Sequence, residues 1–398
     1  MRILVVSTHD SRGGAGKAAY RFSKEFIKQG EEVCLYVQSK KEKDSFIKES
    51  AIPKIVSKLR HFLDFFPGYL LSGFNTDVNF TLGLFGEDLQ KVINQFKPDV
   101  INVHWTWKGF ISFLQICKIS RKVPVVWTMH DYSPFSDGIF YPSEIKTPLL
   151  KILVSVNRKI REIVFKRSNI TFVSPSKFLL NEFNKSKMSK ASNGYTINNG
   201  IDLTMFHEQD KQMAKTNLGW DKSRRYVLFG AVNLIDNEVK GGQVLTEVLK
   251  KMEDYLLENN VSLVSFGSQN PFEDIGLDQK IEQIFLGYIK SEKVAELMKA
   301  SDVMLVPSRY ENYPFVAIES LCCGTPVVAF KVGGIPEIID EINKGYLATP
   351  LANEDYLNGI KYVLEHTTKS WDNKFYDISI KGSEYIRLFN DCVKASRG

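Results

Sequence analysis

The chain has 398 residues, of which 43% are hydrophobic and 25% are charged, a composition that excludes a disordered protein. Because this length exceeds the size at which one hydrophobic core keeps growing, we expect two domains. The net charge of +6 permits an anionic ligand or surface but is too small to indicate nucleic-acid binding.

The five cysteines include no pair spaced as in a zinc site, and their number is odd. This usage favours a reducing compartment over a disulfide framework. Met1 leads almost directly into a short apolar run, unlike the charged start and longer apolar stretch of a signal peptide. No apolar run has the length of a membrane span, so we expect a cytoplasmic protein.

The N-terminal half alternates short apolar runs with segments of helical length. Ile3–Val6 reads as a buried strand, Gly13–Gly16 as a glycine cluster, Lys17–Gln29 as an amphipathic helix ended by Gly30, and Val33–Val37 as the next strand. This order predicts a βαβ unit with parallel strands. Further strands are expected at Val100–Val103, Val123–Thr128 and Ile170–Ser174.

Two segments of this half are less regular. Residues 53–90 are rich in Phe and Leu and are interrupted by Pro67, Gly68 and Gly73. Residues 146–167 form a basic amphipathic stretch. Both are explained by surface helices packed on the sheet, and the alternative is contact with anionic lipid headgroups.

A second series of strands and helices begins after a polar stretch at 198–220 that is rich in turn residues. Its strands are expected at Tyr226–Phe229, Leu263–Phe266, Val303–Val306 and Val327–Ala329. The sequence therefore predicts an α/β protein with an N-terminal domain over 1–200 and a C-terminal domain over 201–378. Residues 379–398 are expected to form a helix that packs back on the N-terminal domain.

The segment after Val303–Val306 carries the strongest functional signal. Ligands of open α/β sheets bind beside the carboxyl ends of the strands, and Glu311 follows such an end. Pro314 suits the first position of a helix, whose N–H groups at Phe315 and Val316 can hold a phosphate. Glu319 lies further along this helix. Each glutamate alone fits a surface residue, whereas the whole block favours acceptors for sugar or ribose hydroxyls.

A second set of polar residues follows strands of the N-terminal half. His130 ends Val125–Thr128 and can donate a hydrogen bond to a sugar hydroxyl or an acceptor. Asp131 is expected either to orient His130 or to bind the acceptor. Trp105 and Trp107 can each stack on an acceptor sugar or pack in the core.

Other nucleotide or metal motifs are missing from the sequence. The glycine cluster at 13–16 has neither the spacing of a nucleoside-triphosphate loop nor that of a dinucleotide fingerprint. No histidine or carboxylate cluster has metal-ligand spacing, so we expect neither a metal nor a cofactor.

The segment Glu311–Glu319 resembles the Glu-x7-Glu motif of retaining glycosyltransferase family 4, which has the GT-B fold. Similar matches are Val332–Ile339, Asn199–Asp202 with Phe206, Phe285–Tyr288, Lys240-Gly241 and Gly13-Gly14. The resemblance spans nearly the whole chain. It implies two Rossmann-like domains that face each other across a cleft.

The same resemblance implies roles for individual residues. Glu311 would contact the transferred sugar, Glu319 the ribose, and Lys240 the diphosphate together with the N–H groups of Phe315 and Val316. The remaining implied donor contacts are Asn312, Tyr288 beside the base, and Gly14, whose lack of a side chain lets the backbone approach phosphate. His130 would contact the donor sugar.

One feature departs from the family. An arginine that binds diphosphate commonly precedes the lysine in a Gly-Arg-Leu segment, and this chain has Gly230-Ala231-Val232 instead. Either Lys240 carries more of the charge, or Arg309 or Lys290 substitutes.

The resemblance implies transfer of a sugar from a UDP- or GDP-sugar to an acceptor hydroxyl with retention at the anomeric carbon. The expected partners are that donor, a glycan or lipid-linked glycan of surface-polysaccharide synthesis, and an anionic membrane surface, but no nucleic acid. The alternatives are a non-catalytic sugar-nucleotide or carbohydrate-binding protein and a sugar-nucleotide epimerase of the same fold.

Overall fold

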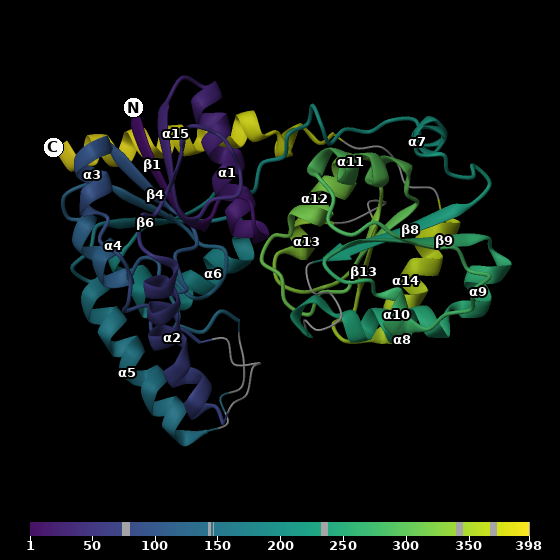
Figure 1. Ribbon diagram of the computed structural model, residues 1–398, viewed down its shortest axis with the longest axis horizontal. Coiled ribbons are helices and arrows are strands. Elements are labelled where there is room, and N and C mark those ends of the chain that lie inside the picture. The colour runs from purple at the N-terminus through teal and green to yellow at the C-terminus, as the bar shows by residue number, and fades with distance from the viewer. Residues whose placement is uncertain are drawn as a thin grey trace. The chain divides into compact units, whose positions relative to one another are not determined.

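The computed structural model describes residues 1–73, 80–141, 145, 147–231, 238–339, 345–366 and 372–397. The chain divides into two compact units, each with its own parallel sheet (Figure 1). Unit 1 comprises Met1–Gly200 and Ile378–Gly398, and unit 2 comprises Ile201–Asp377.

Unit 1 is built on a seven-stranded sheet in the order β3-β2-β1-β4-β5-β6-β7. Its strands are β1 (Arg2–His9), β2 (Glu32–Ser39), β3 (Ile47–Glu49), β4 (Val100–Val103), β5 (Val125–Thr128), β6 (Ile170–Ser174) and β7 (Gly194–Thr196). Its α-helices are α1 (Gly13–Lys28), α2 (Lys54–Leu71), α3 (Gln90–Phe96), α4 (Phe113–Ile119), α5 (Pro148–Phe165), α6 (Lys177–Lys185) and α15 (Ile378–Arg397). The central strands are buried and mostly apolar because helices cover both faces of a parallel sheet.

Two helices of unit 1 differ from the sequence-based expectation. Helix α1 begins at Gly13 rather than near Lys17, so the glycine cluster forms its first turn. A small residue is needed there because a Cβ at Gly16 would lie 3.0 Å from the His9 carbonyl oxygen. Helix α2 continues through Pro67, which was expected to interrupt it.

Helix α15 completes unit 1 from the far end of the chain. It packs against α1, where the rings of Tyr385 and Phe389 meet those of Phe22 and Phe26 edge to face. The four rings are almost fully buried, so this aromatic cluster removes a large apolar area from water.

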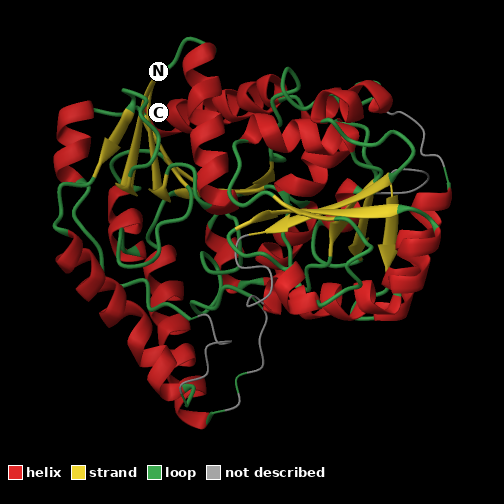
Figure 2. Cartoon of the chain, turned by 45° about the vertical axis from the view of Figure 1, so that its right-hand side comes forward, coloured by secondary structure: helices red, strands yellow, loops and turns green. Residues whose placement is uncertain are grey.

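Unit 2 is built on a six-stranded sheet in the order β10-β9-β8-β11-β12-β13, again all parallel. Its strands are β8 (Arg225–Ala231), β9 (Val261–Gly267), β10 (Gln283–Phe285), β11 (Val303–Val306), β12 (Val327–Phe330) and β13 (Gly345–Ala348). Its α-helices are α7 (Lys211–Leu218), α8 (Gly242–Lys251), α9 (Glu253–Glu258), α10 (Phe272–Ile275), α11 (Ser291–Ala300), α12 (Phe315–Cys322), α13 (Ile335–Ile338) and α14 (Asn353–Glu365). Helices line both faces of the sheet (Figure 2).

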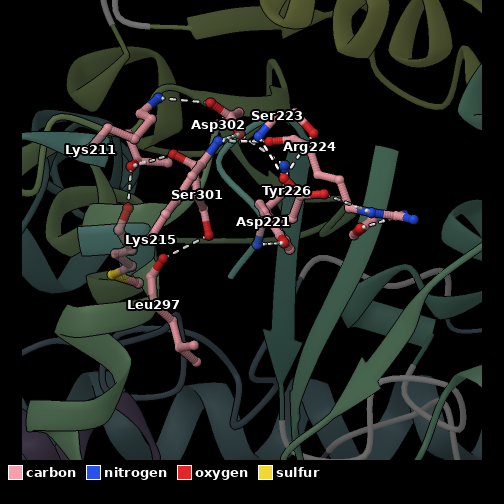
Figure 3. A network of polar contacts seen from close by, with 12 residues as sticks. Lys211, Lys215, Asp221, Ser223, Arg224, Tyr226, Leu297, Ser301 and Asp302 are labelled. Carbon is pink, nitrogen blue, oxygen red and sulfur yellow. Dashed lines mark hydrogen bonds and ion pairs between the residues drawn. The ribbon is translucent and has the colours of Figure 1, made fainter. Parts of the chain in front are cut away.

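A partly buried carboxylate, that of Asp302, links α7 to this sheet. Asp302 accepts hydrogen bonds from Lys211 Nζ at 3.2 Å, from Lys215 Nζ at 3.0 Å and from the backbone N–H of Tyr226 at 2.8 Å (Figure 3). The Lys215 side chain is only 3% exposed and also donates to the Arg224 carbonyl. The pairing compensates for the burial of its charge.

Candidate active site

Glu311 and Lys240 of unit 2 are in direct contact. Glu311 Oε1 accepts hydrogen bonds from Lys240 Nζ and, at 3.1 Å, from Ser308 Oγ. The side chains are 14% exposed at Glu311 and 33% exposed at Lys240. The residues predicted for the sugar and for the diphosphate therefore form an ion pair within unit 2.

Two glycines bring the surrounding loops together. A Cβ at Gly241 would overlap the Pro307 carbonyl oxygen, and a Cβ at Gly333 would overlap that of Glu311. Both glycines have positive φ, 75° and 57°, which other residues seldom adopt. The loops after β8, β11 and β12 consequently meet at the carboxyl edge of the sheet around Glu311.

Helix α12 follows this loop. It begins at Phe315, so Pro314 is its N-cap and not its first helical residue as predicted. The Ala317 N–H donates to the Pro314 carbonyl at 3.2 Å, and this bond closes the first turn of the helix. Phe315 and Val316 lie within that turn. The macrodipole of α12 favours an anion at this end. Glu319 lies one turn further on and is only 3% exposed.

Two other predicted donor residues of unit 2 lie outside this helix. Asn312 is half-buried in the loop after Glu311. Tyr288 is 65% exposed, and the preceding Gly287 accepts from the N–H of Gly267 at the end of β9. Tyr288 therefore follows the carboxyl edge of the same sheet, with a ring face accessible to a flat ligand.

The two cations considered as substitutes for the missing arginine lie in different surroundings. The Arg309 N–H donates to the Val239 carbonyl at 2.9 Å, and its guanidinium pairs with Glu238 at 2.5 Å. Arg309 thus adjoins the turn that carries Lys240. Lys290 is exposed at the start of α11. Gly230 and Ala231 end β8, and Val232 lies outside the described residues.

In unit 1, His130 belongs to a buried hydrogen-bonded chain that runs through two strands. His130 Nε2 lies 2.9 Å from His104 Nδ1, and His104 Nε2 lies 2.8 Å from Asn102 Oδ1. Asn102 Nδ2 donates to the Val126 carbonyl at 3.1 Å and to Thr128 Oγ1 at 3.2 Å. Thr128 in turn lies 3.0 Å from the Tyr385 hydroxyl of α15.

This chain determines the tautomers of the two imidazoles. Because the Asn102 amide nitrogen donates to a carbonyl, its oxygen accepts the proton of His104 Nε2. His104 Nδ1 then accepts from His130 Nε2, and the acceptor atom of the His130 ring is Nδ1. Burial lowers the pKa of His130 to about 3 and that of His104 well below 6.5, so both rings are neutral.

The network revises the expectation for His130. The ring was expected to donate a hydrogen bond to a ligand, but its Nε2–H points to His104, so Nδ1 suits a hydroxyl that donates. From the sequence, no role was expected for Asn102, His104 or Tyr385. Of the three, Asn102 carries a signal in the sequence, because it is a polar residue inside the otherwise apolar strand Val100–Val103.

Asp131 holds the loop that follows His130. It accepts from the Ser133 N–H at 2.8 Å, from the Ser133 hydroxyl and from Trp105 Nε1 at 3.1 Å, but not from His130. Burial raises the pKa of Asp131 to about 6, and these hydrogen bonds oppose that rise. Trp107 is 2% exposed and packs in the core, whereas Trp105 is only half-buried. Trp105 is thus the tryptophan of the two that can meet a ligand.

Gly14 lies in the first turn of α1 and is exposed. A Cβ built on Gly14 would meet no atom within 4 Å, so the fold of unit 1 alone does not require glycine there. The open backbone permits close approach of a ligand to this helix terminus.

Two features are absent from the described ranges. No group of three or more His, Cys, Asp or Glu side chains is arranged to hold a metal ion there. None of the helices in those ranges is both long and apolar enough to cross a bilayer.

Two family models match the chain in succession. Residues 12–205 match the model described as Glycosyltransferase Family 4, and residues 210–376 match that of Glycosyl transferases group 1. An uncharacterised glycosyltransferase of Methanocaldococcus jannaschii is 30% identical over 326 residues, which cover 73% of this chain and 75% of the relative.

Two further relatives have named activities. The N-acetyl-alpha-D-glucosaminyl L-malate synthase of Bacillus anthracis is 26% identical over 65% of this chain. The sulfoquinovosyl transferase SQD2 of Arabidopsis thaliana is 26% identical over 68% of this chain. The chain spans 63% of the length of the first and 51% of the second.

Solved structures confirm the predicted fold class. Sucrose-phosphate synthase from Thermosynechococcus elongatus has a TM-score of 0.64 at 17% identity, covering 99% of this chain and 97% of that chain. Anabaena HepE in complex with UDP has a TM-score of 0.66 at 15% identity, covering 98% and 100%. At these identities the similarity shows the fold alone, a GT-B arrangement of two Rossmann-like domains.

Proposed function

The chain belongs to glycosyltransferase family 4, and from this membership we propose that it transfers a sugar from a nucleoside-diphosphate sugar to an acceptor hydroxyl. The observation that carries the proposal is the meeting of Lys240 and Glu311 at the carboxyl edge of the unit 2 sheet, enforced by Gly241 and Gly333. A cation for the diphosphate and a carboxylate for sugar hydroxyls are thereby side by side.

The leaving diphosphate requires positive charge as its bond to the sugar breaks. Lys240, the N–H groups of the first turn of α12, and Arg309 supply it in this proposal. We assign Arg309 the part of the missing family arginine because its backbone is bonded to Val239, next to Lys240. No metal ion is invoked. Donor binding would release Lys240 from Glu311 and Arg309 from Glu238.

The other residues of unit 2 would select the donor. Glu319 would accept the ribose hydroxyls, and Tyr288 would stack on the base. Asn312 would assist at the sugar. Solved structures of the same fold include complexes of HepE with UDP, with UDP-glucose, and with UDP and glucose, which supports a UDP-sugar as the first donor to test.

Unit 1 would contribute the sugar and acceptor contacts. His130 Nδ1 would accept a hydrogen bond from a hydroxyl of the transferred sugar, Gly14 would admit phosphate or acceptor to the backbone, and Trp105 would stack on the acceptor. Asp131 would act by fixing Trp105. These roles are proposals for the assembled two-unit enzyme.

The finer proposal concerns stereochemistry and pathway. We assign retention of configuration, with the acceptor hydroxyl attacking from the face that the diphosphate leaves and its proton passing to the leaving phosphate. The acceptor would be a lipid-linked glycan of surface-polysaccharide synthesis, reached from the cytoplasmic side of the membrane.

A panel of UDP- and GDP-sugars tests the proposal directly. One donor should raise the melting temperature, bind in calorimetry, and be consumed with release of its nucleoside diphosphate when an acceptor glycan is added. An epimerase would instead convert the sugar nucleotide without releasing diphosphate. A binding protein would show affinity without turnover, and absence of both binding and slow donor hydrolysis would contradict the proposal.

A further inference from the structure

Helices α2 and α5 lie side by side in unit 1, as both views show (Figures 1 and 2). Thr147 Oγ1, at the start of α5, donates to the Leu71 carbonyl at the end of α2. The inward faces of both helices pack on the segment from Phe80 to Leu84. Asp64 of α2 bonds Thr81, and Arg161 of α5 bonds the carbonyls of Thr81 and Leu82.

The outward face of α2 is apolar. Ile55 is 76% exposed, and it begins a stripe of apolar residues that lie on one side of the helix. The exposed side chains of this stripe are Ile55, Leu59, Phe62, Leu63 and Leu70. They lie opposite the buried Asp64 and Gly68, so folding of unit 1 does not cover them.

The outward face of α5 repeats this pattern. Its exposed apolar side chains are Leu149, Ile152, Val156 and Ile163, again at helical spacing. Nine of the twenty large hydrophobic side chains exposed in the described ranges lie on these two helices, each only 18 residues long. Soluble proteins seldom leave such a concentration of apolar surface in water without a partner.

Basic residues accompany the two stripes. The exposed or half-exposed cations are Lys54, Lys58 and Arg60 on α2, and Lys151, Arg158 and Lys159 on α5. The acids on these helices are Asp64, which is buried, and Glu162, whose side chain is only 19% exposed. Lys159 follows Val156 by three residues, within the α5 stripe. The surface of α2 and α5 is therefore apolar with a positive border.

We propose that the paired outward faces of α2 and α5 bind the surface of an anionic lipid bilayer. An aliphatic stripe with lysines beside it is the pattern of a helix that lies in the headgroup region, with its apolar face among the acyl chains and its ammonium groups at the phosphates. The nearly complete absence of exposed acid on these helices favours lipid phosphate over a protein partner, which would pair charges of both signs.

The proposal does not depend on the transferase activity, because the surface is confined to unit 1 and includes none of the residues assigned to catalysis. Its consequence is a unit held at the membrane by many weak contacts. Such binding is reversible and sensitive to both salt and lipid charge.

The test is co-sedimentation of the full chain with vesicles, in the absence of nucleotide. Vesicles of phosphatidylcholine and phosphatidylglycerol in equal parts should bind the chain at least about tenfold more tightly than vesicles of phosphatidylcholine alone. The apolar variant carries Ile55→Gln, Leu59→Gln, Ile152→Gln and Val156→Gln. These side chains are exposed, so the folded unit should keep its melting temperature and its circular dichroism.

The apolar variant should bind the anionic vesicles about tenfold or more weakly, because each lost side chain removes inserted methylene groups. A charge variant, Lys58→Gln with Lys159→Gln, should lose affinity at low salt and differ little from the parent at high salt. Met213→Gln replaces an equally exposed residue of α7 and serves as the matched control, with no expected effect.

Two results would overturn the proposal. One is unchanged vesicle binding in both the apolar and the charge variants while their folds are intact. The other is a chain that self-associates in solution through this surface, becomes monomeric in the apolar variant, and shows no vesicle binding in any form.

Discussion

Replacing Glu311 by glutamine should have opposite effects on product binding and on turnover. Lys240 is bonded to Glu311 in the structure, so a nucleoside diphosphate that binds Lys240 competes with that carboxylate for the ammonium group. The Glu311 carboxylate then lies near the diphosphate anion without its partner Lys240. Glutamine removes both costs but also weakens the acceptor for the hydroxyls of the transferred sugar. We expect Glu311→Gln to tighten UDP or GDP binding while slowing transfer.

The exposure of the ion pair determines the effect on diphosphate binding, and the weakened hydrogen bond to the sugar determines the effect on turnover. The Lys240 side chain is 33% exposed, so solvent screens the attraction and the pair contributes only about 1 kcal/mol. Freeing Lys240 should therefore lower the Kd of the diphosphate about fivefold. A lost hydrogen bond between a sugar hydroxyl and a charged group costs about 1.5–3 kcal/mol, which lowers kcat/KM by about 10- to 100-fold.

Calorimetry with UDP and GDP measures the first effect, and initial rates with the donor sugar measure the second. Lys240→Gln is the matched control, since it removes the other half of the pair and should weaken diphosphate binding. Ser308→Ala removes the smaller neighbour of Glu311 and should change affinity less than twofold, by about 0.3 kcal/mol. Weaker diphosphate binding by Glu311→Gln would refute the proposed exchange of partners.

Three further outcomes concern stability. Below pH 6.5 the unfolded chain binds two protons at His104 and His130 that the folded chain does not bind, and between about pH 6 and 3.8 the folded chain binds one extra proton at Asp131. The free energy of unfolding should therefore fall as the pH is lowered, by about 1.4 kcal/mol per pH unit in that range. Urea titrations at several pH values measure this slope, and a flat profile would contradict the neutral state of the two histidines. Arg161→Met removes the donor from the Ser133 and Leu82 carbonyls, whereas the Thr81 carbonyl keeps Asn157, and should cost about 3 kcal/mol in denaturant unfolding, with Arg158→Met as the exposed control. Asp302→Asn removes the carboxylate that pairs with the buried Lys215 and should lower the free energy of unfolding by about 3 kcal/mol, measured as a lower melting temperature of unit 2. An unchanged melting temperature would mean that the Lys215 ammonium group finds another acceptor.

Apolar runs predicted the central strands of both sheets, because parallel strands covered on both faces must be apolar. Val303–Val306 and Ile170–Ser174 have the same limits in the sequence and in the structure. The edge strands Ile47–Glu49 and Gly194–Thr196 were not predicted. They are three residues long and pair on one side only, so nothing apolar marks them.

The part of the site that could be predicted consists of residues that directly follow strands. Parallel strands bring the residues after β8, β11 and β12 to one edge, so a cluster near Glu311 follows from the strand order. The Lys240–Glu311 ion pair did not follow, because it depends on the path of a long loop. The bond from Asn102 to His104 and Thr128 also required the pairing of Asn102 with Val126, a register that periodicity does not reveal.

Helix α15 has a consequence for the order of folding. Unit 1 begins at residue 1, yet the Tyr385 and Phe389 rings that fill its aromatic cluster are synthesised after all of unit 2. During translation, unit 2 can fold while the face of α1 around Phe22 and Phe26 is still open to solvent. Unit 1 thus begins to emerge from the ribosome before unit 2 but is completed after it, and the nascent chain has an exposed apolar surface on α1 until α15 is made.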